Sequence, residues 1–116
     1  MRLIADLAVV VVALLHLGFL VLEMFLWTKP FGRRTFGLSR ELAEATKGLA
    51  ANQGLYNGFL AAGLLWGLTA GDAVKIFFLA CVIVAGIFGA ITAKRSILFV
   101  QALPGILALA AVLLAR

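Results

Sequence analysis

Long apolar stretches occupy most of the chain, and only short polar segments separate them. These stretches lie at about 3–27, 49–70, 74–93 and 96–115. A helix of 20 residues is about 30 Å long, which matches the hydrocarbon core of a membrane. Each stretch is therefore long enough to cross a bilayer as a helix. The pattern predicts an all-α integral membrane four-helix bundle, built as a single transmembrane domain over residues 1–116.

The connection 28–48 is the only long one. Pro30 is expected to end the first helix, because proline lacks the N–H that continues a helix. Ser39 is expected to cap the next helix, whose pattern continues to Ala70. Such a helix rises about 48 Å, which is longer than a bilayer is thick. We therefore expect it to begin in water or among lipid headgroups and to enter lipid near Leu49.

Tight turns separate the remaining stretches. Gly71 and Asp72 precede the third stretch, and the segment 94–96 precedes the fourth. Pro104 removes a backbone donor in the middle of the fourth stretch, so a kink is expected between Val100 and Pro104.

Composition places the chain in lipid rather than in water. Hydrophobic residues make up 65% of the 116 residues and charged residues 13%, whereas soluble domains contain about 25% charged residues. Mean hydropathy is +1.16. A soluble protein of this size would have too little interior for so much apolar surface. Membrane lipids are therefore the expected surroundings.

The charge and the numbers of cysteine and histidine residues argue against nucleic-acid binding, a disulfide and a metal site. The net charge is +5, but no basic helix face is interleaved with aromatic residues, so nucleic acid is not an expected partner. The single cysteine, Cys81, excludes an internal disulfide, and the only histidine, His16, leaves no His and carboxylate cluster that suits a metal. We expect neither a metal site nor a cofactor.

The distribution of basic residues predicts the orientation in the cell membrane. Segments 28–48 and 93–96 fall on one side, and together they hold seven of the ten basic residues: Lys29, Arg33, Arg34, Arg40, Lys47, Lys94 and Arg95. The other side holds three: Arg2, Lys75 and Arg116. Basic residues favour the cytoplasm, so a multi-pass protein with both termini outside is expected. The first stretch is expected to be a retained span rather than a cleaved signal peptide.

Polar side chains within the spans indicate where a ligand binds. Glu23 and His16 are seven residues apart in the first stretch and share one helix face. Ionisable residues inside a membrane are rare and usually functional. The expected ligand-binding residues are His16, close to the midplane, and six residues in the cytoplasmic half of the spans: Glu23, Asn52, Gln53, Tyr56, Asn57 and Gln101.

Small residues at four-residue intervals are expected to let helices pack closely. The pairs in the second stretch are Gly54 with Gly58 and Gly63 with Gly67, and those in the third are Ala85 with Gly89 and Gly86 with Ala90. Such pairs bring helix backbones together. The pattern does not distinguish packing within one chain from packing in a homo-oligomer.

Four sequence blocks resemble a known family. They are HLGFLVLEMFLW, LAANQGLYNGFLAAGLLWG, CVIVAGIFGAIT and VQALPGILAL. They are similar to the family catalogued as domain of unknown function 1304, whose members are small bacterial and fungal membrane proteins. The resemblance covers essentially the whole chain. It implies a membrane protein and assigns no activity.

Three functions fit these observations. The first is binding or transport of a small amphiphilic or cationic ligand, with Glu23 as the acceptor of a cation or proton. The second is a membrane-embedded enzyme that acts on a lipid-like substrate, with His16 and Glu23 as general acid and base. The third is a structural or accessory protein whose polar groups only fix helix packing. Whether the protein is an enzyme stays open, and binding or transport is preferred.

Overall fold

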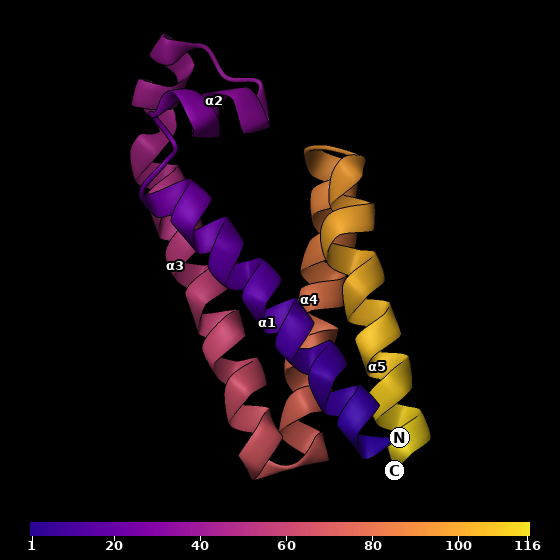
Figure 1. Ribbon diagram of the computed structural model, residues 1–116. Coiled ribbons are helices and arrows are strands. Elements are labelled where there is room, and N and C mark those ends of the chain that lie inside the picture. The colour runs from indigo at the N-terminus through magenta and orange to yellow at the C-terminus, as the bar shows by residue number, and fades with distance from the viewer. The chain divides into compact units, whose positions relative to one another are not determined.

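The computed structural model describes all 116 residues, and its regular elements are all helices. Its elements are α1 (Arg2–Met24), α2 (Pro30–Phe36), α3 (Arg40–Ala70), α4 (Asp72–Thr92), the π-helical segment η1 (Leu98–Ala102) and α5 (Leu103–Ala115) (Figure 1). The all-α fold class is confirmed. Three helical segments are long and apolar enough to cross a membrane: Arg2–Met24, Asp72–Thr92 and Leu98–Ala115. The chain forms two compact units, residues 1–15 with 60–116 and residues 16–59.

The first unit has a core of small and branched apolar side chains from four helical segments. Its buried residues are Ala5, Val9, Val12 and Ala13 of α1, Ala61 and Leu64 of α3, Leu79 and Val82 of α4, and Ala108 and Val112 of α5. The spacing of three or four residues within each segment places these side chains on one face of each helix. The four segments therefore pack around a shared apolar interior.

Glycine allows α4 to approach η1 and α5 closely. A Cβ atom at Gly86 would lie 2.7 Å from the backbone nitrogen of Ala102 and 2.9 Å from its Cα. A Cβ atom at Gly105 would lie 3.0 Å from Cγ1 of Val82. The two helical stretches run side by side in Figure 1. A predicted small residue of α4 thus forms a backbone-to-backbone contact.

Pro104 disturbs the last helix, as the sequence predicts, and the disturbance is a π-helical turn. The N–H of Leu103 donates to the carbonyl of Leu98, five residues earlier. Proline cannot donate, and its ring clashes with the carbonyl four residues before it, here that of Val100. Widening the helix over 98–102 relieves that clash.

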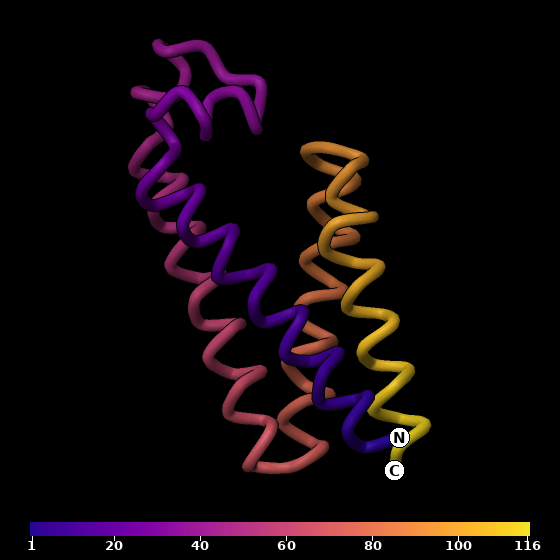
Figure 2. Tube along the Cα trace, in the orientation of Figure 1, coloured from indigo at the N-terminus to yellow at the C-terminus, as the bar shows by residue number.

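The second unit contains a helix that the sequence did not predict. α1 ends at Met24, before the predicted end at Trp27. After a short connection the chain forms α2, which lies within the expected loop (Figure 2). Pro30 occupies the first turn of α2, where its missing N–H leaves no intrahelical bond unmade. The prediction that Pro30 ends the first helix is therefore wrong: α1 already ends at Met24, and Pro30 begins α2. Gly37, with φ of 65°, ends α2 in the left-handed conformation that glycine adopts easily.

The predicted start of α3 is confirmed. Ser39 Oγ accepts a hydrogen bond of 3.1 Å from the N–H of Leu42. This bond satisfies one of the donors left free in the first turn of a helix. The segment 28–48 therefore holds α2 and the first turns of α3 rather than an extended loop.

Candidate functional site

Gly54 positions Glu23 beside α3 in the second unit. A Cβ atom at Gly54 would lie 2.6 Å from Cγ of Met24 and 3.2 Å from both Cβ of Glu23 and the carbonyl oxygen of Leu20. One turn along α3, a Cβ atom at Gly58 would lie 2.8 Å from Cδ1 of Leu20. The predicted pair of glycines therefore packs α3 against α1 of the same chain.

Asn57 holds the carboxylate of Glu23. Its Nδ2 donates to Oε1 of Glu23 at 2.5 Å. Asn57 is 5% exposed, so this hydrogen bond lies between the two helices. Asn57 follows Gly54 by three residues, and this spacing puts both residues on the face of α3 that meets α1. The second oxygen, Oε2, accepts no hydrogen bond from the chain.

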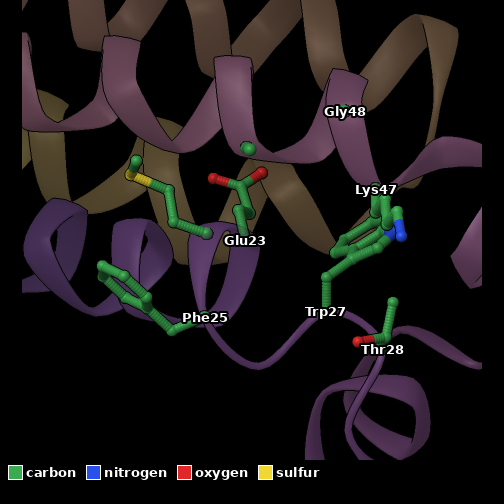
Figure 3. Close-up of a pocket in the computed structure, with 8 residues that line it drawn as sticks. Glu23, Phe25, Trp27, Thr28, Lys47 and Gly48 are labelled. Atoms are coloured by element: carbon green, nitrogen blue, oxygen red, sulfur yellow. The ribbon is translucent and has the colours of Figure 1, made fainter.

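A cavity of about 300 Å³ opens beside Glu23. Its lining residues are Glu23, Met24, Phe25, Trp27 and Thr28 from the end of α1 and the turn that follows, and Lys47, Gly48 and Ala51 from α3. Figure 3 shows Glu23 extending from α1 towards α3, and Trp27 and Lys47 line the same cavity. The cavity thus combines one acidic group, one basic group and an apolar surface.

Contacts with α2 and α3 fix the wall of the cavity at Trp27. Nε1 of Trp27 donates to Oγ1 of Thr46 at 3.0 Å. The indole also packs on Phe36 of α2, with ring centroids 4.9 Å apart. Nζ of Lys47 lies 3.3 Å from Oε1 of Glu44, in an ion pair whose side chains are both more than half exposed. The aromatic wall is therefore held in place, and the basic group is free to change partners.

Only two of the predicted polar residues meet at this site, Glu23 and Asn57. Asn52, Gln53 and Tyr56 are exposed, because their positions on α3 turn them away from the face of Gly54 and Asn57. Four polar groups within six residues cover too wide an arc for all of them to face one neighbouring helix.

The remaining two predicted residues lie outside the cavity lining. His16 is fully buried, and its ring meets the edge of Phe19 with centroids 5.2 Å apart. Gln101 is half-buried in η1, which belongs to the first unit. The predicted face shared by His16 and Glu23 therefore does not place both side chains on the cavity.

Sequence reasoning missed Trp27 and Lys47 as parts of the site. The sequence suggests that Trp27 is an interfacial anchor and that Lys47 is a charge that sets orientation, and neither interpretation predicts that the two residues line a cavity. A usable signal lies in the spacing of α3. Lys47, Ala51 and Gly54 recur at intervals of four and three residues, which places Lys47 on the same helix face as the glycine that packs on Glu23.

A second charged cluster lies in the first unit and was also missed. Nζ of Lys75 is 2.8 Å from Oδ1 of Asp6 and 3.4 Å from Oδ1 of Asp72. The side chain of Lys75 is only 3% exposed. Arg2 adds a longer contact of 3.9 Å to Asp72. Asp6 inside the first apolar stretch was the available signal, because an acid there needs a partner.

Comparison with known proteins gives a family and no activity. The family model described as "Protein of unknown function (DUF1304)" matches residues 10–113. The match includes every residue that lines the cavity beside Glu23. No curated protein and no solved structure matches the chain. The chain belongs to the DUF1304 family of proteins of unknown function.

Proposed function

We propose that this chain is a four-span protein of the cell membrane that binds or transports a small cationic amphiphile in the cavity beside Glu23. The observation that carries the proposal is the carboxylate of Glu23, which lines a cavity at the end of a largely apolar helix. A carboxylate in such surroundings attracts a cation, and Met24 and Phe25 supply apolar surface for the rest of the ligand.

The partners of Glu23 favour a positively charged ligand group. Asn57 occupies Oε1, while Oε2 has no hydrogen-bond partner in the chain. An ammonium group would give Oε2 a charge-assisted hydrogen bond or, if fully methylated, an ion pair. The Trp27 ring on the same cavity also favours a cation, since the faces of aromatic rings attract positive charge.

The proposal includes α3 as a fourth span. Residues 49–70 would be about 33 Å long as a helix, enough to cross a bilayer. Ala61 and Leu64 of this stretch pack in the same core as side chains of α1, α4 and α5. α1, α4 and the segment made of η1 and α5 are each long and apolar enough to cross a membrane. The amides of Asn52, Gln53 and Asn57 lower its hydropathy. The distribution of basic residues would place both termini outside and the Glu23 cavity on the cytoplasmic side.

Binding is favoured over acid–base catalysis by the position of His16. A general acid and a general base must both reach the reacting atoms of one substrate. His16 and Glu23 are separated by about 10 Å along α1, and His16 is fully buried outside the cavity lining.

An accessory role is supported by a different observation. The hydrogen bond from Asn57 to Glu23 is the contact expected if the polar groups only join helices.

Glu23→Gln is expected to abolish most ligand binding while the protein stays folded. Glutamine retains an oxygen that accepts the hydrogen bond from Asn57, but it removes the negative charge that would hold the ammonium group. A close pair of opposite charges across a binding interface contributes about 1.5 kcal/mol or more, so binding should weaken by roughly tenfold or more. The measurement is the melting temperature of the protein in non-ionic detergent during titration with alkyltrimethylammonium, which rises if the folded state binds.

Glu41→Gln is the matched control, because Glu41 is an exposed acid of the same unit that does not line the cavity. It should leave the titration unchanged. A parent protein that shows no rise in melting temperature, or a rise that persists in Glu23→Gln, contradicts the binding proposal. A flat titration together with a destabilised Asn57→Leu variant would favour the accessory role instead.

A further inference from the structure

The short helix α2, which follows α1, presents an aromatic ring and a guanidinium group on one exposed face. We propose that α2 lies in the headgroup layer of the membrane and binds anionic phospholipids, with Phe31 among the acyl chains and Arg34 at the phosphate groups. This inference rests on the part of the proposed function that places α1 across a membrane. It does not depend on what the cavity beside Glu23 binds.

Two contacts fix which face of α2 packs on the rest of its unit. Gly32 lies so close to the carbonyl oxygen of Leu26 that no Cβ atom would fit between them. Phe36, four residues later, packs its ring on Trp27, with ring centroids 4.9 Å apart. Residues four apart lie on one side of a helix. The side of α2 that carries Gly32 and Phe36 is therefore covered by the chain itself.

The other side of α2 carries Phe31 and Arg34. The side chain of Phe31 is 57% exposed, and Arg34 is exposed as well. Because the two residues are three apart in a helix, their side chains are neighbours on its surface. Arg33, by contrast, is only partly exposed, and its Nε donates to the carbonyl oxygen of Thr28 at 3.2 Å. The exposed face thus combines an apolar ring with a basic group that can bind an anion.

Positive charge is concentrated on α2 rather than spread over the whole connection between α1 and α3. The segment 28–37 contains Lys29, Arg33 and Arg34 and no acidic residue. The first turns of α3, in the same unit, hold two basic and two acidic residues: Arg40, Glu41, Glu44 and Lys47. A guanidinium group binds phosphate through two parallel hydrogen bonds. The local excess of positive charge therefore suits a phosphate-bearing surface.

The direction of α2 fits a position in the membrane surface. Its axis runs across the end of α1 rather than along it (Figure 1). In the proposed arrangement α1 spans the bilayer, so a helix that crosses its end lies in the plane of the headgroups. Aromatic rings are favoured at this depth. The cytoplasmic leaflet is anionic and attracts basic segments that flank a span, and the basic residues of 28–48 place α2 on that side.

The test uses Trp27, which packs on α2, as a fluorescent reporter of the lipids nearby. Trp66→Phe leaves Trp27 as the only tryptophan, and the exposed position of Trp66 should tolerate the change. The full-length protein is reconstituted into phosphatidylcholine bilayers that contain brominated phosphatidylglycerol or, in separate samples, the same fraction of brominated phosphatidylcholine. Bromine quenches tryptophan at short range, so the ratio of the two quenching values gives the preference for the anionic lipid.

We expect the anionic lipid to bind near Trp27 several-fold more strongly than the neutral one. A basic residue near an anionic surface contributes up to about fivefold to binding. Arg34→Gln should therefore lower the preference by up to about fivefold, whereas Arg34→Lys should retain most of it. Arg40→Gln is the matched control, because Arg40 is an exposed basic residue of the same unit in the segment where charges balance. It should leave the preference unchanged, and high salt should lower the preference of the parent.

A spin label tests the position of Phe31 independently of lipid charge. Cys81 is the only cysteine, so Phe31→Cys in a Cys81→Ala background carries one nitroxide label. Oxygen is concentrated in lipid, and a nickel chelate stays in water. We expect the label at position 31 to collide more with oxygen than with the chelate. A label on Arg40→Cys, at the start of α3, should show the reverse.

Failure of this inference is distinguishable from failure of the proposed function. Equal binding of the two lipids by the parent, or a preference that Arg34→Gln leaves unchanged, would overturn the assignment of anionic phospholipid. A label at position 31 that collides mainly with the chelate would overturn the position of α2 in the headgroup layer. Neither result bears on ligand binding beside Glu23. Quenching of Trp27 by neither lipid would contradict the membrane placement of α1, and with it the proposed function.

Discussion

Gly86→Ala is expected to lower the free energy of unfolding by about 1–2 kcal/mol, although alanine is the better helix former. The added Cβ would lie 2.7 Å from the backbone nitrogen of Ala102 and 2.9 Å from its Cα. Backbone atoms cannot move aside as a flexible side chain can, so α4 and η1 must separate. Overpacking typically destabilises by about 1–3 kcal/mol, and the gain in helix propensity offsets up to about 1 kcal/mol of this.

Gly89→Ala is the matched control on the same helix. Its Cβ would meet only side-chain atoms of Ile97, at 3.2 and 3.3 Å, and these atoms can shift by a few tenths of an ångström. We expect Gly89→Ala to be within about 0.5 kcal/mol of the parent or slightly more stable. Equilibrium unfolding in detergent measures both variants. Equal stabilities for the two would show that the contact of Gly86 with Ala102 is not as close as the structure has it.

The small-residue pattern predicted close packing without saying where it occurs. Ala85 with Gly89 and Gly86 with Ala90 are equivalent as sequence pairs. Only Gly86 is pressed against a neighbouring backbone, that of Ala102. Which face of α4 meets η1 depends on the turn before η1 and on the π-helical widening near Pro104. Neither feature is visible in the spacing of glycine and alanine along α4.

The sequence predicted the acid of the candidate site more reliably than its amides. Glu23 stands out because carboxylates are rare in apolar helices. Asn57 was one of four polar residues predicted in a short segment. It differs from the other three because it lies on the same face of α3 as Gly54, the face that contacts α1. The phase of one helix relative to another is a tertiary property. Asn52 and Tyr56, one turn apart on α3, are both exposed.

The basic residues were predicted as determinants of orientation, and this interpretation hid two contacts. Lys47 lines the cavity beside Glu23, and Lys75 is buried between two acids. Total charge on each side of a membrane is a sum over the chain, so it does not depend on individual partners. The partner of Lys75 in α1, Asp6, is 69 residues away in sequence. Such a pair is visible only after the helices are packed.

Asp6→Ala is expected to destabilise the first unit by about 2 kcal/mol or more, and Lys75→Met is expected to be nearly neutral. The asymmetry follows from exposure. Lys75 is 3% exposed and Asp6 is 34% exposed. Removing Asp6 leaves a buried ammonium group with only Asp72 at 3.4 Å. Removing one partner of a buried pair costs up to about 3–5 kcal/mol, whereas an apolar side chain of similar volume in place of the charge is often tolerated.

The double variant Asp6→Ala with Lys75→Met decides whether the pair acts as a unit. Once methionine replaces Lys75, no buried charge remains to be compensated, so the loss of Asp6 should have little further effect. The coupling between the two substitutions should be about 1–3 kcal/mol in equilibrium unfolding, measured as a double-mutant cycle. Arg2→Gln is the control, because Arg2 is 66% exposed and lies 3.9 Å from Asp72, so its loss should change stability little. Additive effects of Asp6→Ala and Lys75→Met would instead mean that water reaches Lys75 when Asp6 is absent, and that the ammonium group does not depend on its partner in α1.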